Sequence, residues 1–281
     1  MSARVWFITG SSTGFGRATT EVALQKGDIV VATLRKPEVL ADLTKQYGPD
    51  KLLVVKLDVT QPQDIKDAFA AGVKQFGRID VVLNNAGYGL LAEVEGTPDD
   101  VARALFEVNF WGAANVTREA VRVFREVNKP VGGRLLQMSS IAGIGSATTL
   151  GYYGAAKHAL NGLTKALTSE MCPEWNIKMT IVEPSVFRTP AIMQNRVYTP
   201  LHPAYTNSPS AALRNSVTEE FVQAAPDPSE AASRMYTVST LQDPPLHLPL
   251  GKLSVMIIKD TLTKTLADVN NYASWSDDLS M

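Results

Sequence analysis

Residues 9–16 read TGSSTGFG and are the most informative segment for the architecture of the chain. A strand-like apolar run, VWFITG (5–10), leads into it, and a helical pattern over residues 15–26 follows it. Gly10, Gly14 and Gly16 allow a tight turn and a close approach of the backbone to a ligand. The N-terminus of the helix presents unpaired N–H groups to an anion. Although a purely structural turn is the alternative, this strand–turn–helix context favours a site for dinucleotide phosphates.

The chain around this turn alternates short apolar runs with longer helical patterns. Strands are predicted at 5–10, 29–34, 52–59, 79–87, 133–140 and 178–185, and helices at about 15–26, 37–47, 62–76, 98–127 and 151–171. Continuous Val, Ile and Leu runs are typical of strands that are covered on both faces. The alternation predicts an α/β fold with a doubly wound parallel sheet, in a single domain of 281 residues.

The last third of the chain has a different composition. Residues 190–228 are rich in Pro, Ser, Thr and Ala with intermittent large apolar residues, which favours a segment that packs at least part of the time over a disordered insertion. After it, the sequence predicts a helix over 229–242, a short edge strand over 244–251, and a C-terminal helical extension over about 252–275.

Composition and charge argue against several classes of partner. The chain is 45% apolar and 20% charged with a net charge of −1, which gives no electrostatic reason to expect nucleic acid or an anionic membrane. Its single Cys172 excludes an internal disulfide and fits a reducing compartment. Because His158, His202 and His247 lack metal-ligand spacing, we expect no metal. With no targeting segment and no apolar run near the ~20 residues that span a bilayer, we expect a cytoplasmic protein.

The stretch GYYGAAK (151–157) contains a candidate acid–base pair. Tyr153 and Lys157 are four residues apart in a predicted helix and therefore share one face, whereas Tyr152 points away. An ammonium close to a phenol favours the phenolate and lowers the phenol pKa from its usual value of about 10. The pair could thus donate and accept protons near neutral pH. The spacing alone is weak, since Tyr47 and Lys51 share it across a helix-breaking Gly-Pro.

The T-G-x3-G-x-G spacing of residues 9–16 resembles the short-chain dehydrogenase/reductase family, in its single-domain branch. Further motifs follow in the family's order: LDV (57–59), NNAG (84–87), Asn109 in VNFWG, SSIAG (139–143), YGAAK (153–157) and EPSVFRT (183–189). The resemblance covers nearly the whole chain and implies a Rossmann fold of about seven strands. NNAGYG and PPLHLPLG are similar to the steroid- and retinoid-dehydrogenase-like subgroup.

The resemblance assigns chemical roles to four side chains. Ser140 matches the serine that holds the substrate oxygen, although it could instead cap a strand end. Tyr153 matches the acid–base, and Lys157 the lysine that lowers the phenol pKa and holds the nicotinamide ribose. Asn109 matches the asparagine that supports a proton-relay water, with a structural asparagine as the alternative.

The end of the second strand predicts NADP(H) as the cofactor. Thr33 stands where NAD-dependent members carry an acid, and Arg35 and Lys36 follow, so a guanidinium could bind a 2′-phosphate. The alternative for Arg35 is a solvated surface charge. The resemblance implies further cofactor contacts from Gly10, Ser12, Thr13, Gly14, Phe15, Gly16, Asp58, Val59, Asn85, Ala86, Gly87, Tyr153, Lys157, Pro184, Val186 and Thr189. Asn84 is expected to be structural, and Ser185 replaces the family's usual glycine.

The resemblance implies a carbonyl reductase or alcohol dehydrogenase that moves hydride between NADPH and a hydrophobic or medium-sized ketone or alcohol. Residues 190–228 would form the lid over this substrate. A secondary-metabolism reductase acting on an imine or enone is one alternative, and a non-catalytic NADP-sensing or scaffold protein is another. Sensor-type relatives lose the tyrosine or the lysine, which this chain keeps. The family also implies a homodimer or homotetramer that pairs through the helices near 98–127 and 152–171.

Overall fold

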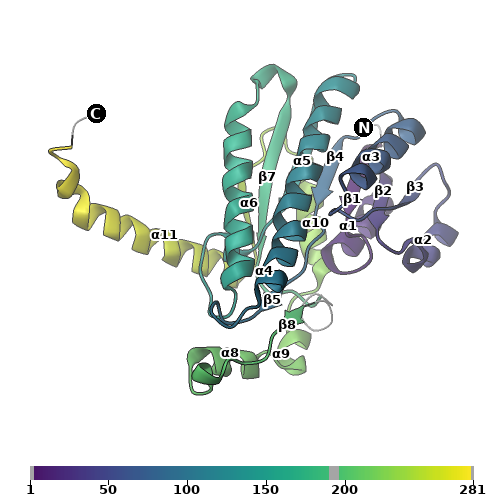
Figure 1. The fold of residues 1–281 in the computed structure, drawn as a ribbon. Helices are drawn as coiled ribbons and strands as arrows, with labels where there is room; N and C mark the ends of the chain where they lie inside the picture. The colour runs from purple at the N-terminus through teal and green to yellow at the C-terminus, as the bar shows by residue number, and fades with distance from the viewer. Residues whose placement is uncertain (1–2, 190–195, 280–281) are drawn as a thin grey trace.

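A seven-stranded sheet forms the centre of the computed structural model, which describes residues 3–189 and 196–279 (Figure 1). Its strand order is β3-β2-β1-β4-β6-β7-β9, and every neighbouring pair is parallel. The strands are β1 (Val5–Thr9), β2 (Ile29–Leu34), β3 (Leu52–Lys56), β4 (Val81–Asn84), β6 (Gly133–Met138), β7 (Ile177–Pro184) and β9 (His247–Leu250). This topology confirms the predicted doubly wound sheet. The strand order reverses between β1 and β4, where such sheets bind their ligands.

Both faces of the sheet are covered by helices. Along β1, Trp6 and Ile8 enter one apolar cluster, and Val5 and Phe7 enter the other. The first cluster includes residues of α1 and α10, and the second includes residues of α3, α5 and α6. The principal helices are α1 (Gly14–Gln25), α2 (Ala41–Gln46), α3 (Pro62–Phe76), α4 (Asp99–Phe106), α5 (Ala113–Arg122), α6 (Gly151–Glu170), α8 (Pro209–Ser216), α9 (Glu219–Gln223), α10 (Pro228–Ser239) and α11 (Lys252–Tyr272).

Two local features differ from the sequence expectation. The predicted helix over 98–127 is interrupted by two π-helical stretches, Glu107–Gly112 and Val123–Val127. A short parallel ladder between β5 (Leu90–Leu91) and β8 (Val197–Tyr198) was not predicted. Neither strand is long enough to show an alternating pattern, because each contributes only two residues.

The C-terminal third contains a segment of short elements, where the lid was predicted, and a projecting arm. Residues 196–228 contain β8, α8 and α9, while residues 190–195 of the predicted lid lie outside the described residues. Helix α11 leaves the body after β9 and extends away from it (Figure 1). Among the described residues, no helix combines the length and hydropathy that a membrane span requires.

Candidate active site

The turn between β1 and α1 packs its backbone too tightly for most side chains. Gly10 and Gly14 have φ values of +69° and +56°, in the region that favours glycine. A Cβ at Gly16 would collide with the carbonyl oxygen of Gly10. Thr13 precedes α1 without a side-chain cap, and the first turn of the helix carries no acidic residue. Its N–H groups are thus left for an anion, so the turn fits the phosphates of a dinucleotide.

Thr9 and Asn85 fix this turn to the end of β4. The hydroxyl of Thr9 accepts hydrogen bonds from the backbone N–H groups of Asn85 and Ala86, at 2.8 and 2.9 Å. The Asn85 amide donates to the carbonyl oxygens of Thr9 and Gly10, at 2.8 and 3.3 Å. The Asn85 side chain therefore braces the turn, which the sequence-based list of cofactor contacts did not anticipate. Asn84 is buried and donates to a carbonyl at the start of α5, at 2.7 Å.

Aromatic packing governs the side chain of Phe15. Its ring lies edge-on against Phe187, with centroids 5.3 Å apart, and it packs against the cluster between the sheet, α1 and α10. Phe15 is half-buried by this packing, and its cofactor contact stays a prediction.

The end of β2 presents two exposed cations. Thr33 is fully buried and its hydroxyl donates to the Ile8 carbonyl at 3.0 Å. It faces the core, so it is not the side chain that would meet a ribose, and the structure corrects that placement. Arg35 and Lys36 are exposed immediately after the strand. The ion pairs formed among the described residues involve neither of them.

Asp58 is held in one orientation beyond the end of β3. Its Oδ1 accepts hydrogen bonds from the backbone N–H and the hydroxyl of Thr60, at 3.0 and 2.8 Å. The next residue, Val59, lies against the long helix, because a Cβ at Gly112 would be 2.9 Å from its carbonyl oxygen. Both residues follow the carboxyl end of a parallel strand, on the edge of the sheet that carries the glycine turn.

Ser140, Tyr153 and Lys157 converge at the end of β6 and the start of α6. The Ser140 oxygen accepts a hydrogen bond from the N–H of Ala142 at 3.1 Å, so it does cap a short turn, as the alternative interpretation held. Its hydroxyl proton can still be donated. Lys157 is buried, and its Nζ donates to the Met138 carbonyl at 2.9 Å and lies 5.8 Å from the centre of the Tyr153 ring.

Burial controls the pKa of both ionisable groups. Desolvation raises the pKa of Tyr153, while a hydrogen bond with Ser140 and the positive charge of Arg196 lower it in part. Burial lowers the pKa of Lys157 to about 8. The sequence predicted a lowered pKa for Tyr153, and the structure gives the opposite direction, because the Lys157 ammonium donates to Met138 and desolvation outweighs the nearby charges. A phenol that keeps its proton is suited to act as an acid.

Asn109 is fully buried in the first π-helical stretch, a feature that often marks functional sites. Its Oδ1 accepts from the N–H of Tyr88 at 3.0 Å, and its Nδ2 donates to the Tyr88 carbonyl at 2.8 Å. A Cβ at Gly87 would lie 2.9 Å from the same Oδ1. The side chain thus has a structural role, as the alternative interpretation held, and the water relay stays a prediction.

The segment after β7 reaches back to the glycine turn. Pro184 ends β7, Val186 is half-buried, and Thr189 is buried. A Cβ at Gly14 would lie 3.3 Å from the Cβ of Thr189. The residues expected at the nicotinamide and the residues expected at the phosphates therefore meet at one edge of the sheet.

A buried polar cluster next to Ser140 was missed by the sequence analysis. Glu183 is fully buried, and its Oε1 is 2.9 Å from Nδ1 of His247 and 3.3 Å from the donating amide of Asn161. Desolvation raises the pKa of Glu183. Within the described part of the chain, Glu183 Oε2, Asn161 Oδ1 and Ser139 Oγ have no hydrogen-bond partner. Two features of the sequence could have indicated this cluster. Glu183 is an acid at the end of an apolar run, and His247 is the only polar residue in the short strand β9.

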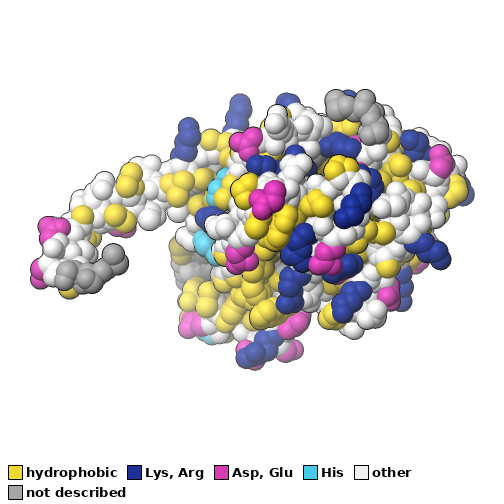
Figure 2. Space-filling view, turned by 90° about the horizontal axis from the view of Figure 1, so that it is seen from above, with side chains coloured by type: hydrophobic (Ala, Val, Ile, Leu, Met, Phe, Trp, Pro, Cys, Tyr) yellow, Lys and Arg dark blue, Asp and Glu magenta, His cyan; other side chains and the backbone are white. Residues whose placement is uncertain are grey.

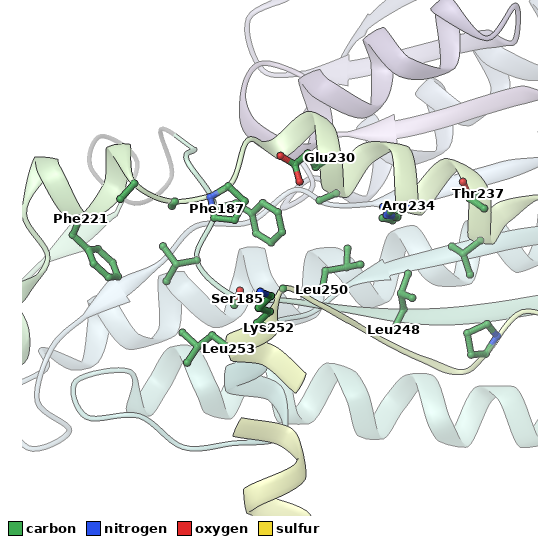
Figure 3. A pocket seen from close by; sticks show the side chains of 18 of the residues that line it. Ser185, Phe187, Phe221, Glu230, Arg234, Thr237, Leu248, Leu250, Lys252 and Leu253 are labelled. Atoms are coloured by element: carbon green, nitrogen blue, oxygen red, sulfur yellow. The ribbon is translucent and has the colours of Figure 1, made fainter. Parts of the chain in front are cut away.

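A cavity of about 810 Å³ lies beside this site rather than in it. Figure 3 shows it between α10, β9 and the start of α11, with Phe221 of α9 at one end. Its lining is mainly apolar and includes Phe187, Leu248, Leu250 and Leu253. It shares the residues after β7 with the candidate site, but neither Ser140 nor Tyr153 lines it.

Comparisons with known proteins agree with this geometry. The family model described as short chain dehydrogenase matches residues 4–198. An uncharacterised oxidoreductase of Schizosaccharomyces pombe is 39% identical over 252 residues, which cover 90% of this chain and 83% of the relative. The crystal structure of a short-chain dehydrogenase from Streptomyces avermitilis is 33% identical, with a TM-score of 0.88 over 100% of both chains. An alcohol dehydrogenase of the archaeon Thermococcus sibiricus, complexed with 5-hydroxy-NADP, shares the fold at 20% identity and a TM-score of 0.71, over 89% of this chain and 96% of that one.

The fold and the glycine turn define a Rossmann-type oxidoreductase. The chain belongs to the short-chain dehydrogenase/reductase family, whose members bind nicotinamide cofactors.

Proposed function

We propose that the protein is an NADP(H)-dependent carbonyl reductase and alcohol dehydrogenase in which Tyr153 transfers the proton. The observation that carries this proposal is the convergence of Ser140, Tyr153 and Lys157 at the sheet edge that holds the glycine turn. Bound nicotinamide would supply or accept the hydride. The protein would then need to position a carbonyl and manage one proton.

Each of the three side chains would have a separate role in this reaction. Ser140 and Tyr153 would both donate hydrogen bonds to the substrate oxygen, and the Tyr153 proton would pass to it during reduction. Lys157, with a pKa of about 8, changes charge more readily than an exposed lysine and suits a proton path. Asn109 fixes the adjacent chain at Tyr88, which supports a positioning role.

The preference for NADP(H) rests on Arg35 and Lys36. Both side chains are exposed at the end of β2, and no acidic side chain follows that strand directly. A guanidinium there could bind the two-oxygen edge of a 2′-phosphate. The other cofactor contacts inferred from the family motifs are part of the same proposal.

The surroundings of Tyr153 favour a substrate with an apolar body. Its ring packs against a cluster formed by Leu90, Ala92 and Leu105, together with Tyr88 and Tyr152. We infer a hydrophobic or medium-sized ketone or alcohol, covered by the lid that follows residue 190.

We also propose that the protein is a cytoplasmic homo-oligomer. Val255, Leu262, Leu266 and Val269 fall on one face of α11 at helical spacing. The last three are 56%, 60% and 59% exposed, and Figure 2 shows hydrophobic side chains along the projecting arm. A second copy that covered this stripe would remove apolar surface from water. The free Cys172 fits a reducing compartment.

The experiment that tests the catalytic proposal compares two neighbouring tyrosines. Tyr153→Phe should lower NADPH-dependent turnover of a panel of ketones, aldehydes and imines by about 10²- to 10⁴-fold, the usual contribution of a positioned acid. NADPH binding, followed by fluorescence, should persist. Tyr152→Phe keeps the same helix and should have a mild effect. Near-normal turnover by Tyr153→Phe would remove this residue from the mechanism, and NADPH binding without turnover of any carbonyl would favour a sensor.

A further inference from the structure

Arg196 immediately precedes β8 and lies close enough to Tyr153 for its charge to act on the phenol. The N–H of the following residue, Val197, donates to the Gly89 carbonyl at 2.9 Å, in the ladder between β5 and β8. The Arg196 side chain crosses Gly89 so closely that a Cβ there would lie 3.1 Å from Nε and 3.4 Å from Cγ. Gly89 is flanked by Tyr88 and Leu90, which pack in the same cluster as Tyr153. The Arg196 side chain is thereby brought to the cluster that contains Tyr153.

The charge of Arg196 has no partner among the ion pairs of the described residues. Its Nε is buried and has no hydrogen-bond partner among residues 3–189 and 196–279. An unmet buried donor is costly, and natural structures satisfy nearly all such groups. An acceptor from outside the described chain is therefore needed to complete this site.

Glu93, a buried acid of this region, is already paired with a different arginine. Glu93 is 3% exposed, and its two oxygens accept hydrogen bonds from Arg214 at 3.0 and 2.8 Å. Burial alone would raise the pKa of Glu93, but the Arg214 hydrogen bond contributes to lowering it, so this acid stays ionised and paired. Arg214 also donates to the Thr199 carbonyl at 2.8 Å, which fixes the lid after β8. The two arginines thus differ: Arg214 is a structural tie, whereas the Nε–H of Arg196 is unpaired within the described part of the chain.

We propose that Arg196 binds an anionic group of the substrate, and that the substrate is a carbonyl compound that carries a carboxylate. The inference deepens the proposed carbonyl reduction and rests on it for the identity of the reacting group. Nε and one terminal nitrogen form a planar fork that matches the two oxygens of a carboxylate. Apolar neighbours around Tyr153 would exclude water and strengthen this contact. The same charge acts on Tyr153, whose pKa it lowers in part.

The test uses carbonyl compounds in matched charged and neutral forms. Pyruvate, 4-oxopentanoate and 4-acetylbenzoate are compared with their methyl esters, because they separate the carbonyl and the carboxylate by different distances. For at least one pair, wild-type kcat/KM should favour the acid, and Arg196→Gln should lower kcat/KM for that acid by about 10- to 100-fold, as expected for a lost charge-assisted hydrogen bond. The ester should change little. Arg196→Lys should restore part of the preference, since it keeps the charge without the fork.

Two further variants separate charge from packing. Gly89→Ala retains Arg196 but places a methyl group against Nε, so it should weaken the preference for the acid as well. Arg234→Gln removes an exposed arginine of α10, outside the candidate site, and should leave the preference unchanged.

A binding measurement tests the anion site at Arg196 independently of the proposed carbonyl reduction. Benzoate should bind to the wild-type protein with NADPH more tightly than benzamide does in calorimetry, and Arg196→Gln should abolish that difference. If benzoate binding depends on Arg196 but no carbonyl is reduced, the anion site stands and carbonyl reduction fails. If esters and acids are reduced equally and Arg196→Gln leaves benzoate binding unchanged, the anion site at Arg196 is overturned while carbonyl reduction stands. An Arg196→Gln effect confined to the KM for NADPH would also overturn it, by assigning the guanidinium to the cofactor.

Discussion

Replacing Lys157 with methionine should show how much the buried charge of Lys157 lowers the free energy of unfolding. Lys157 is 4% exposed, and burial lowers its pKa from 10.5 to about 8. At 1.36 kcal/mol per unit, this shift corresponds to a penalty of about 3 kcal/mol while the folded protein carries the charge. The folded pKa lies below the unfolded one, so the unfolded chain binds more protons between pH 8 and 10.5. Wild-type stability should therefore rise through that window, with the full penalty present below pH 8.

The Lys157→Met variant lacks this proton linkage. Its free energy of unfolding relative to wild type should fall by about 2 kcal/mol between pH 7 and pH 10. The absolute gain at pH 7 should be smaller than the full penalty, because the Met138 carbonyl loses its donor, at a cost of about 1 kcal/mol. Catalytic turnover should be lost in the same variant. Contributions from Tyr153 largely cancel in the difference, since Lys157 is not among the causes of its pKa shift.

Urea unfolding followed by tryptophan fluorescence at pH 7, 8.5 and 10 would measure this difference, using the 4 tryptophans of the chain. Protein concentration must be held constant, because oligomerisation contributes to apparent stability. Lys66→Met is the matched control: it removes an exposed lysine from α3, and its stability should parallel wild type across the pH range. A constant difference between Lys157→Met and wild type from pH 7 to pH 10 would refute the account of a desolvated ammonium.

Two further predictions concern the cofactor and the arm. Arg35→Ala should raise the KM for NADPH by about 10- to 100-fold, and much less for NADH, which lacks the 2′-phosphate; equal effects in steady-state kinetics would contradict the assignment. Leu266→Glu, on the exposed stripe of α11, should weaken self-association by about 10-fold or more, measured by light scattering across a dilution series, because a charge would replace buried apolar contact. Asn271→Glu, on the opposite face of the same helix, is its control, and an unchanged mass for both variants would exclude α11 from the interface.

The parts of the fold that could be predicted are those that depend only on residues close together in the sequence. The apolar run of β1 splits between two cores because side chains alternate across a strand, so Phe7 and Ile8 necessarily face opposite layers. The glycine turn was equally visible, since its backbone geometry excludes most other residues at Gly10 and Gly16. In both cases, neighbours within one strand or turn determine the structure.

Local sequence was insufficient where a side chain meets a remote segment. Thr33 was aligned with the family's ribose-binding acid, but its hydroxyl donates to the Ile8 carbonyl on the adjacent strand. Asn85 stays a predicted cofactor contact, but the hydrogen bonds from its amide to the turn after β1 were not foreseen. Both hydrogen bonds depend on strand pairing and register, which a single sequence does not specify. The contact between Arg196 and Gly89, on which the proposed anion site rests, was missed for the same reason, because it requires the ladder between β5 and β8.

The pKa of Tyr153 shows how such remote contacts bear on the chemistry. Burial in the cluster around Leu90 raises it, and Ser140 from β6 and Arg196 from the lid lower it. If Arg196 binds a carboxylate, as we propose, that anion neutralises the only charge among these lowering influences. The pKa of the phenol would then rise further once an acidic substrate is bound. Reduction uses the protonated phenol, which is already present at neutral pH, whereas oxidation of the corresponding alcohol needs the phenolate as base. Bound carboxylate would therefore shift the oxidation reaction, and not the reduction, to higher pH.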